Sequence, residues 1–360
     1  MLKVKKTILE IQPYTPGKSK VEGVSKVIKL SSNENPLGCS PKAAAAYKEF
    51  DSFNRYPDAT SAALRSAIGK TYGLDAEKII CGAGSDEVLE QIAYAYCGEG
   101  DEVIYTKHGF LVYPIAAQSA GATPVVAEEK NYTTDVDAIL NKVTAKTRIV
   151  FVANPNNPTG TYIPSTEMLR LRKTLREDIL LVIDAAYAEC VTATDYTDGR
   201  EIVDSTTNTI MTHTFSKIYG LPALRIGWGY ACESIIDILN RIRPPFNINT
   251  PAQAAGIAAL EDAEFTKRSI EHNTKWRDVL TQSINGMGWE VIPSQANFIL
   301  VNFGSNANAA NAFNFLAQKG ILVREVNNYS LPEFLRISFG TDEENDYLLK
   351  CLKEFKSSLA

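Results

Sequence analysis

Lys217 and its neighbours have the residue types and spacing needed for covalent chemistry on an aldehyde. The segment Thr214-Phe215-Ser216-Lys217 places two hydroxyls just before the lysine, and Arg225 follows eight positions later. A lysine forms an imine only as the uncharged amine, so it needs surroundings that lower its usual pKa of about 10.4. Hydroxyls and a guanidinium can hold phosphate oxygens beside that amine. The segment predicts a site for a phosphorylated aldehyde, although the tetrapeptide alone would also suit a lysine on a polar loop.

Two further polar groups follow apolar runs that have the length of buried strands. The run Ile179–Ile183 ends in Asp184, and the run Arg148–Ala153 leads into Asn154-Pro155-Asn156-Asn157-Pro158-Thr159-Gly160. In an open parallel sheet, ligands bind outside the carboxyl ends of the strands. A buried Asp184 needs a partner such as a protonated ring nitrogen, and the Asn157 amide can donate to a ring oxygen. The ordinary alternatives are a helix-capping aspartate and a surface loop.

Two more strand ends carry groups suited to a planar, phosphorylated ligand. The run Lys78–Cys81 leads into Gly82-Ala83-Gly84-Ser85-Asp86-Glu87 and then a helix, with Ser85 expected as its N-cap. Backbone N–H groups at a helix N-terminus can bind phosphate. The run Glu102–Thr106 is followed by His108-Gly109-Phe110, which offers an aromatic face for a ring to stack on. Tight strand–helix packing and a core phenylalanine are the competing explanations.

From about residue 60, helix-length amphipathic segments alternate with short apolar runs. Runs without polar alternation indicate strands whose two faces are both covered by helices. We therefore expect an α/β fold with a large domain built on a mostly parallel seven-stranded sheet. The expected strands are Lys78–Cys81, Glu102–Thr106, Pro124–Ala127, Arg148–Ala153, Ile179–Asp184, Thr209–Thr214 and Ile226–Tyr230, and the covering helices include Ser85–Cys97, Ser165–Glu177 and Glu233–Arg241.

The remainder of the chain predicts a smaller α+β domain. A helix is expected after Asn249-Thr250-Pro251, followed by a polar helical stretch over Glu264–Ile284. The small domain then contains strands at Asn297–Val301, Gly320–Arg324 and Phe334–Phe339, with helices at Ala307–Gln318 and from Asp342. We expect an N-terminal arm or lid on the small domain (1–40), a large cofactor-binding domain (41–250), a long connecting helix (251–285) and a small C-terminal domain (286–360).

Composition excludes several classes of function. The net charge of −5 and a pI near 5.5 give no basic surface for nucleic acid. No apolar run is long enough to span a membrane, and the N-terminus lacks the apolar region of a secretory signal. The six cysteines and three histidines are scattered, which favours free thiols over disulfides and argues against a metal site. We expect a soluble cytoplasmic protein.

In this order along the chain, these motifs resemble those of fold-type I pyridoxal-phosphate aminotransferases, and most closely those of histidinol-phosphate aminotransferases. The resemblance implies that Lys217 binds the aldehyde carbon and shuttles a proton, Asp184 pairs with the ring nitrogen, and Phe110 stacks on the ring. Asn157 and Tyr187 would hold the ring oxygen. The phosphate would be held by the backbone amides of Ser85 and Asp86 and by Thr214, Ser216 and Arg225.

The same resemblance implies a homodimer. Tyr56, in Arg55-Tyr56-Pro57-Asp58, resembles the tyrosine that reaches the phosphate of the neighbouring subunit's cofactor, although it could equally be a packed loop residue. One position departs from the family pattern, because many relatives carry a glutamate where this chain has Ala185. Glu189 could compensate for that missing carboxylate.

The predicted substrate site contains two arginines. In the strand Leu335–Phe339, Arg336 alternates with apolar residues, so it can face an anion instead of the core. The resemblance implies that the substrate is bound by Tyr14, Asn33, Asn157, Arg324 and Arg336. Two arginines and a tyrosine suit a phosphate dianion better than a single carboxylate.

The expected activity is transamination between L-histidinol phosphate and 2-oxoglutarate, giving imidazole-acetol phosphate and L-glutamate in histidine biosynthesis. An aromatic-amino-acid aminotransferase on the same scaffold is the main alternative, with the arginines holding carboxylates. A phosphothreonine-type decarboxylase is a third. A non-catalytic regulator is disfavoured because the chain is acidic and has no room for a DNA-binding module.

Overall fold

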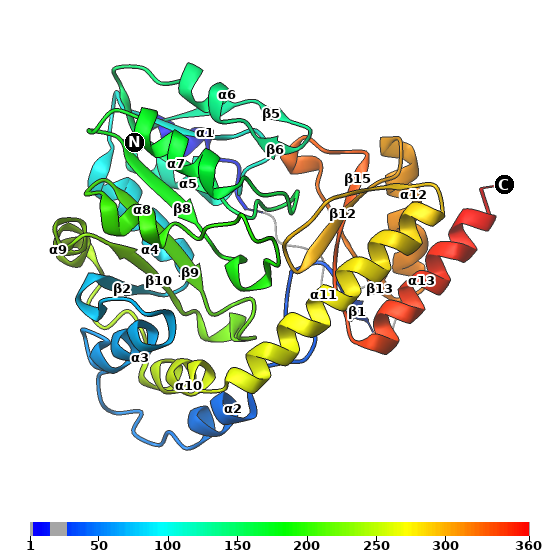
Figure 1. Cartoon of the computed structure of the whole chain (residues 1–360), viewed down its shortest axis with the longest axis horizontal. Coiled ribbons are helices and arrows are strands. Elements are labelled where there is room, and N and C mark those ends of the chain that lie inside the picture. The colour runs from blue at the N-terminus through cyan, green and yellow to red at the C-terminus, as the bar shows by residue number, and fades with distance from the viewer. Residues whose placement is uncertain (1–2, 15–26, 360) are drawn as a thin grey trace.

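A seven-stranded sheet forms the centre of the larger part of the molecule, and the computed structural model describes residues 3–14 and 27–359 (Figure 1). The strand order is β2-β10-β9-β8-β7-β3-β4, and every strand except β10 runs in the same direction. The mostly parallel seven-stranded sheet predicted from the sequence is therefore confirmed. Its strands are β2 (Ile79–Gly82), β3 (Glu102–Thr106), β4 (Thr123–Ala127), β7 (Thr147–Ala153), β8 (Leu180–Asp184), β9 (Thr209–Thr214) and β10 (Gly227–Ala231).

Helices cover both faces of this sheet, and each face has its own apolar core. In β7, Val150 and Val152 pack in one core whereas Ile149 and Phe151 pack in the other, as expected for side chains that alternate along a strand. The helices of this part are α2 (Pro41–Lys48), α3 (Ala62–Tyr72), α4 (Ser85–Tyr96), α5 (Val112–Ala120), α6 (Val136–Asn141), α7 (Ser165–Thr174), α8 (Arg200–Ser205), α9 (Glu233–Ile242) and α10 (Thr250–Leu260), with the short pair β5 (Glu129–Lys130) and β6 (Thr133–Thr134) at one edge.

The helix that follows β2 begins one residue differently from the prediction. Gly84 is the N-cap, with φ of +87°, and Ser85 is the first residue of α4. Glycine accepts a positive φ without the steric cost that a Cβ imposes. The prediction of Ser85 as the N-cap is therefore wrong by one position, and the turn delivers the Ser85 backbone N–H to the sheet edge.

A second, antiparallel sheet of order β11-β12-β15-β14 lies in the other part of the molecule, where it packs on α12 and α13 around a separate core. Its elements are β11 (Glu290–Ile292), β12 (Phe298–Asn302), α12 (Asn306–Gln318), β14 (Arg324–Glu325), β15 (Phe334–Ser338) and α13 (Asp342–Ser357). The predicted strand Gly320–Arg324 is divided into β13 (Ile321–Leu322) and β14, which join different sheets. The outer limits of the two domains stay predictions.

The segment 251–285 is not one connecting helix. It contains α10, which contacts α2 and α3 beside the large sheet, and α11 (Ala263–Gly286), which runs toward the small sheet (Figure 1). Asp262 separates the two helices. Its carboxylate accepts the Phe265 backbone N–H and the Ser40 hydroxyl, at 3.2 and 2.5 Å. An aspartate that caps a new helix explains why the helical pattern restarts there.

The N-terminal arm contacts both parts of the molecule. Strand β1 (Ile28–Lys29) pairs in parallel with β13, and Leu30 is buried in the core of the small sheet. The short helix α1 (Lys6–Glu10) instead contacts α5 beside the large sheet. The expectation that the whole arm packs on the small domain is thus wrong for α1. None of the helices within residues 3–14 and 27–359 is long and apolar enough to cross a membrane.

Candidate active site

One cavity of about 290 Å³ lies at the carboxyl ends of the large-sheet strands and reaches the small sheet. It gathers residues that are far apart in the sequence, because both sheets and the N-terminal arm contribute to its wall. Every predicted site residue except Tyr56 lines it: Tyr14, Asn33, Ser85, Asp86, Phe110, Asn157, Asp184, Tyr187, Thr214, Ser216, Lys217, Arg225, Arg324 and Arg336.

Lys217 lies in the turn after β9, and its Nζ is 5.7 Å from the centre of the Tyr187 ring. The pKa of Lys217 is lowered to about 8, and removal from water is the main cause, with the nearby Arg336 guanidinium as the second. A lower pKa leaves more of the amine uncharged near neutral pH, as a nucleophilic lysine requires. Lys217 therefore lies in surroundings that lower its pKa, as imine formation requires.

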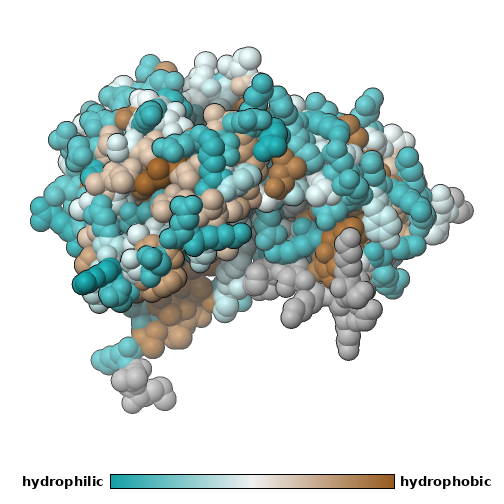
Figure 2. Space-filling view, turned by 90° about the horizontal axis from the view of Figure 1, so that it is seen from below, coloured by the Kyte–Doolittle hydropathy of each residue, from teal (hydrophilic) through white to brown (hydrophobic). Residues whose placement is uncertain are grey.

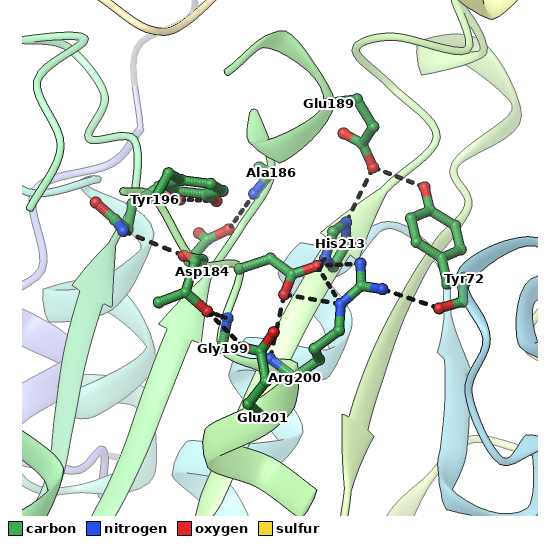
Figure 3. Close-up of polar contacts among 12 residues, drawn as sticks. Tyr72, Asp184, Ala186, Glu189, Tyr196, Gly199, Arg200, Glu201 and His213 are labelled. Carbon is green, nitrogen blue, oxygen red and sulfur yellow. Dashed lines mark hydrogen bonds and ion pairs between the residues drawn. The ribbon is translucent and has the colours of Figure 1, made fainter. Parts of the chain in front are cut away.

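Asp184 ends β8 and is buried beneath the cavity. Its Oδ2 accepts the Tyr113 hydroxyl at 2.7 Å. Its Oδ1 accepts the Ala186 backbone N–H at 3.2 Å (Figure 3). Burial raises the pKa of Asp184, while the two donors lower it. A buried carboxylate that faces a cavity is stabilised by a cationic partner, and a protonated ring nitrogen would supply one.

A cradle for a phosphate group lies at the N-terminus of α4. The Thr214 hydroxyl donates to Ser216 Oγ at 3.0 Å, and the Arg225 guanidinium contacts Ser216 and Asp86 at 3.3 and 3.2 Å. A Cβ on Gly227 would overlap the backbone nitrogen of Ser85, so the glycine lets β10 approach the helix end. Backbone N–H groups, hydroxyls and a guanidinium form a donor set that fits a phosphate dianion.

Arg336 stands on β15 and connects the two parts of the molecule. Its Nη1 donates to Asn157 Oδ1, and its Nη2 donates to the Ser31 carbonyl at 2.9 Å. Its guanidinium lies over the Phe298 ring, 5.2 Å from the centre. Burial lowers the pKa of Arg336, and its Nε has no hydrogen-bond partner among the described residues. A buried guanidinium with a spare N–H is suited to an anionic ligand.

Arg324 is the direct cross-strand neighbour of Arg336, in the β14–β15 pair. Side chains at paired positions stand on the same face of a sheet, so the two guanidinium groups are neighbours in the cavity wall. Tyr14, which is half exposed, lines the same cavity. Two adjacent positive charges repel each other unless an anion lies between or beside them. This wall of the cavity favours a ligand that carries a double negative charge.

Tyr56 does not line the cavity of its own chain. Its side chain is 82% exposed and stacks on Phe246 with ring centres 4.6 Å apart. A tyrosine this exposed is available to a neighbouring molecule, which leaves its predicted role across a dimer interface untested.

The proposal that Glu189 replaces the family glutamate at Ala185 is wrong. Ala185 is fully buried and outside the cavity wall. The short helix η2 (Ala188–Cys190) directs Glu189 away from Asp184, so that its Oε1 accepts the Tyr72 hydroxyl at 2.7 Å and lies 3.0 Å from His213 Nδ1 (Figure 3). Glu189 therefore belongs to a separate polar cluster behind the site.

Tyr113 was missed by sequence reasoning. It is fully buried, it stacks on Phe151 with ring centres 4.8 Å apart, and its hydroxyl contacts Asp184. Tyr113 comes three residues after Phe110, and side chains at that spacing lie on one side of a helical turn. That spacing was the available signal. Among the described residues, no cluster of three or more histidine, cysteine, aspartate or glutamate side chains could hold a metal ion.

Known proteins share both the sequence and this fold. The family model for aminotransferase class I and II matches residues 25–352. A histidinol-phosphate aminotransferase of Rhodopseudomonas palustris is 54% identical, covering 97% of this chain and 96% of its own, and one of Paramagnetospirillum magneticum is 50% identical, covering 97% of each. A crystal structure of histidinol-phosphate aminotransferase from Sinorhizobium meliloti in complex with pyridoxal-5'-phosphate superposes with a TM-score of 0.88, at 28% identity and with 93% and 92% of the two chains covered. This chain belongs to the class I and II aminotransferase family.

Proposed function

We propose that this enzyme uses pyridoxal phosphate to transfer an amino group from L-histidinol phosphate to 2-oxoglutarate, giving imidazole-acetol phosphate and L-glutamate in histidine biosynthesis. The observation that best supports this substrate is the cross-strand pair of Arg324 and Arg336 in the cavity wall. A phosphate dianion satisfies two adjacent guanidinium groups better than one carboxylate does. The full-length similarity to histidinol-phosphate aminotransferases supports the same substrate.

Bound pyridoxal phosphate supplies an electron-accepting ring that stabilises negative charge at the substrate carbon. The residues of the chain do the rest. Lys217 Nζ, uncharged for part of the time because of its lowered pKa, would hold the cofactor at its aldehyde carbon; once released, the same amine would take the proton from the substrate carbon. Asp184 would keep the ring nitrogen protonated, and Phe110 would cover one face of the ring.

The remaining cofactor contacts orient the ring. Asn157 and Tyr187 would donate to the ring oxygen. The backbone amides of Ser85 and Asp86, together with Thr214, Ser216 and Arg225, would hold the phosphate. Holding the cofactor at both ends would restrict its motion relative to Lys217, and restricted motion of the reacting groups lowers the entropic part of a reaction barrier.

We further propose that the enzyme works as a homodimer in the cytoplasm, with Tyr56 reaching the phosphate of the partner subunit's cofactor. The stacked pair of Tyr56 and Phe246 presents aromatic surface to solvent, and Phe53 nearby in the sequence is 81% exposed. Hydrophobic side chains gather in patches between hydrophilic ones on the face seen from below (Figure 2). Apolar patches on a protein surface commonly mark interfaces between proteins.

A panel of half-reactions tests the proposed function. Purified holoenzyme is mixed in turn with L-histidinol phosphate, L-phenylalanine and L-glutamate, and conversion of the cofactor to its amine form is followed by absorbance. We expect L-histidinol phosphate to react with the highest kcat/KM. A higher value for phenylalanine would establish the aromatic alternative, and loss of carbon dioxide from a phosphorylated amino acid would establish a decarboxylase.

A further inference from the structure

Asn33 is a buried residue of the N-terminal arm whose side chain reaches the cofactor-binding tyrosine. Its Nδ2 lies 2.9 Å from the Tyr187 hydroxyl oxygen. The backbone around it is tied to the small sheet, because the Asn33 N–H donates to Ser338 Oγ at 2.8 Å and its carbonyl accepts Asn297 Nδ2 at 2.9 Å. Asn33 also has a φ of +55°, a conformation that asparagine tolerates better than most residues.

The direction of every hydrogen bond in this chain of contacts follows from one fixed donor. A backbone N–H can only donate, so Ser338 Oγ is the acceptor for Asn33 N–H. The Ser338 hydroxyl proton is then free for its other partner, the Asn33 side-chain oxygen at 2.9 Å. With its oxygen turned to Ser338, the Asn33 amide must present its NH₂ group to Tyr187.

The Tyr187 hydroxyl oxygen therefore accepts a hydrogen bond from the arm, and its own O–H must donate elsewhere. A phenol hydroxyl has one proton to donate. The Tyr187 side chain is buried, lines the cavity, and lies beside Lys217. The acceptor available in that direction is a group bound in the cavity.

We propose that Ser338 and Asn33 are positioning residues that set the Tyr187 hydroxyl as a donor into the cavity. This inference rests on the proposed function, in which Tyr187 donates to the ring oxygen of pyridoxal phosphate. The small sheet would thereby control the cofactor through a relay of three side chains, Ser338, Asn33 and Tyr187, although neither Ser338 nor Asn33 needs to touch the cofactor.

The competing explanation is that Asn33 only anchors the arm to the small sheet. Both explanations predict lower stability when Asn33 or Ser338 is changed, so activity alone does not separate them. The pH at which the absorbance of the bound cofactor changes does separate them. Negative charge on the ring oxygen stabilises the proton on the nitrogen that would join Lys217 to the cofactor. A hydrogen-bond donor to that oxygen weakens this stabilisation, so loss of the donor raises the pH at which the proton leaves and the absorbance changes.

Asn33→Asp is the sharpest variant, because a carboxylate at position 33 would accept from both Ser338 and Tyr187 and so reverse the last hydrogen bond. Four holoenzymes form a double-mutant cycle: the unaltered protein, Asn33→Asp, Tyr187→Phe, and the double variant. In the tyrosine background we expect Asn33→Asp to raise the titration pH by about one unit more than it does in the phenylalanine background, the equivalent of one ordinary hydrogen bond. The phenylalanine background measures the effect of the added charge alone.

Substitutions that leave the charge unchanged provide a second test. Ser338→Ala should raise the titration pH, since the Asn33 amide can then rotate, and Ser338→Thr should restore it because the hydroxyl returns. Asn297→Ala is the matched control, since it removes a hydrogen bond to the Asn33 carbonyl and leaves the side-chain relay intact. Its titration pH should equal that of the unaltered protein.

Equal shifts for Asn33→Asp in both backgrounds, or an Asn297→Ala shift as large as that of Ser338→Ala, would overturn the inference. The titrations require only that the cofactor is bound. A protein that binds the cofactor and shows the expected titrations, yet does not accept L-histidinol phosphate, would overturn the proposed substrate and leave the relay standing.

Discussion

The lowered pKa of Lys217 predicts how fast the cofactor-free protein captures an aldehyde. A pKa of about 8 in place of 10.5 makes roughly 9% of the amine uncharged at pH 7, compared with about 0.03% for an ordinary lysine. That difference is about 300-fold in reactive amine. Since the capture rate is proportional to the uncharged fraction, it should rise with pH and level off above about 8.

Arg336 offers a way to perturb this pKa. Its guanidinium is the second cause of the shift after burial, and Arg336→Met removes that charge with a side chain of similar length. We expect the midpoint of the rate profile to move upward, toward 10.5, while the limiting rate at high pH changes little. At pH 7 the variant should therefore capture the aldehyde more slowly than the unaltered protein.

Stopped-flow absorbance with pyridoxal, which lacks the phosphate, measures the rate between pH 6 and 10.5 without a contribution from phosphate binding. Lys217→Ala corrects for reaction at other lysines. A midpoint near 10.5 in the unaltered protein would refute the role of burial. An unchanged midpoint in Arg336→Met would refute the electrostatic part of the reasoning.

Four other outcomes follow from the site. Arg324→Met should lower kcat/KM for L-histidinol phosphate by about 10- to 100-fold, the equivalent of one charged hydrogen bond, and that for phenylalanine by less; equal losses in steady-state assays would favour an aromatic substrate. Tyr113→Phe should raise the pKa of Asp184 further by removing a donor, and an unchanged pH profile of kcat would contradict this. Mixed dimers of inactive Tyr56→Ala and Lys217→Ala subunits should regain activity, whereas no recovery on mixing would place Tyr56 outside the site. In the cofactor-free protein, the folded-state pKa of Lys217 is depressed. Its contribution to the free energy of unfolding should therefore be fully present above pH 10.5 and lost as the pH falls to about 8. Calorimetry across this pH range tests the sign, because Lys217→Met should lack the dependence.

Most strands of the large sheet were predictable because they are short runs buried on both faces, as in Leu180–Asp184, whereas the edge strand β4 is partly exposed. Helix boundaries were harder. Ser85 is a good N-cap residue, yet Gly84 holds that position since the turn requires a positive φ. The break at Asp262 depends on a contact with Ser40, which lies far away in the sequence. Local patterns do not encode such long-range partners.

The same distinction applies to the site. Strand-end placement was enough to bring Asp184, Asn157 and Lys217 into one cavity. Glu189 was misplaced because one short helical turn decides which way it faces. The alternation along β15 puts Ser338 on the same face as Arg336, but the contact of Ser338 with Asn33 joins opposite ends of the chain. That pairing exists only in three dimensions.

The β1–β13 pairing has a consequence for how the enzyme is made. About 290 residues separate Ile28 from its partner Ile321, so the N-terminal segment has no strand to join until nearly all of the polypeptide has left the ribosome. The groups that we propose hold the cofactor, from Ser85 to Arg225, are synthesised well before then. Domains generally fold as they emerge, so the phosphate cradle should fold early, and the cavity wall that contains Arg324 and Arg336 should fold late. A truncated product would thus contain the phosphate cradle without the strands that carry Arg324 and Arg336.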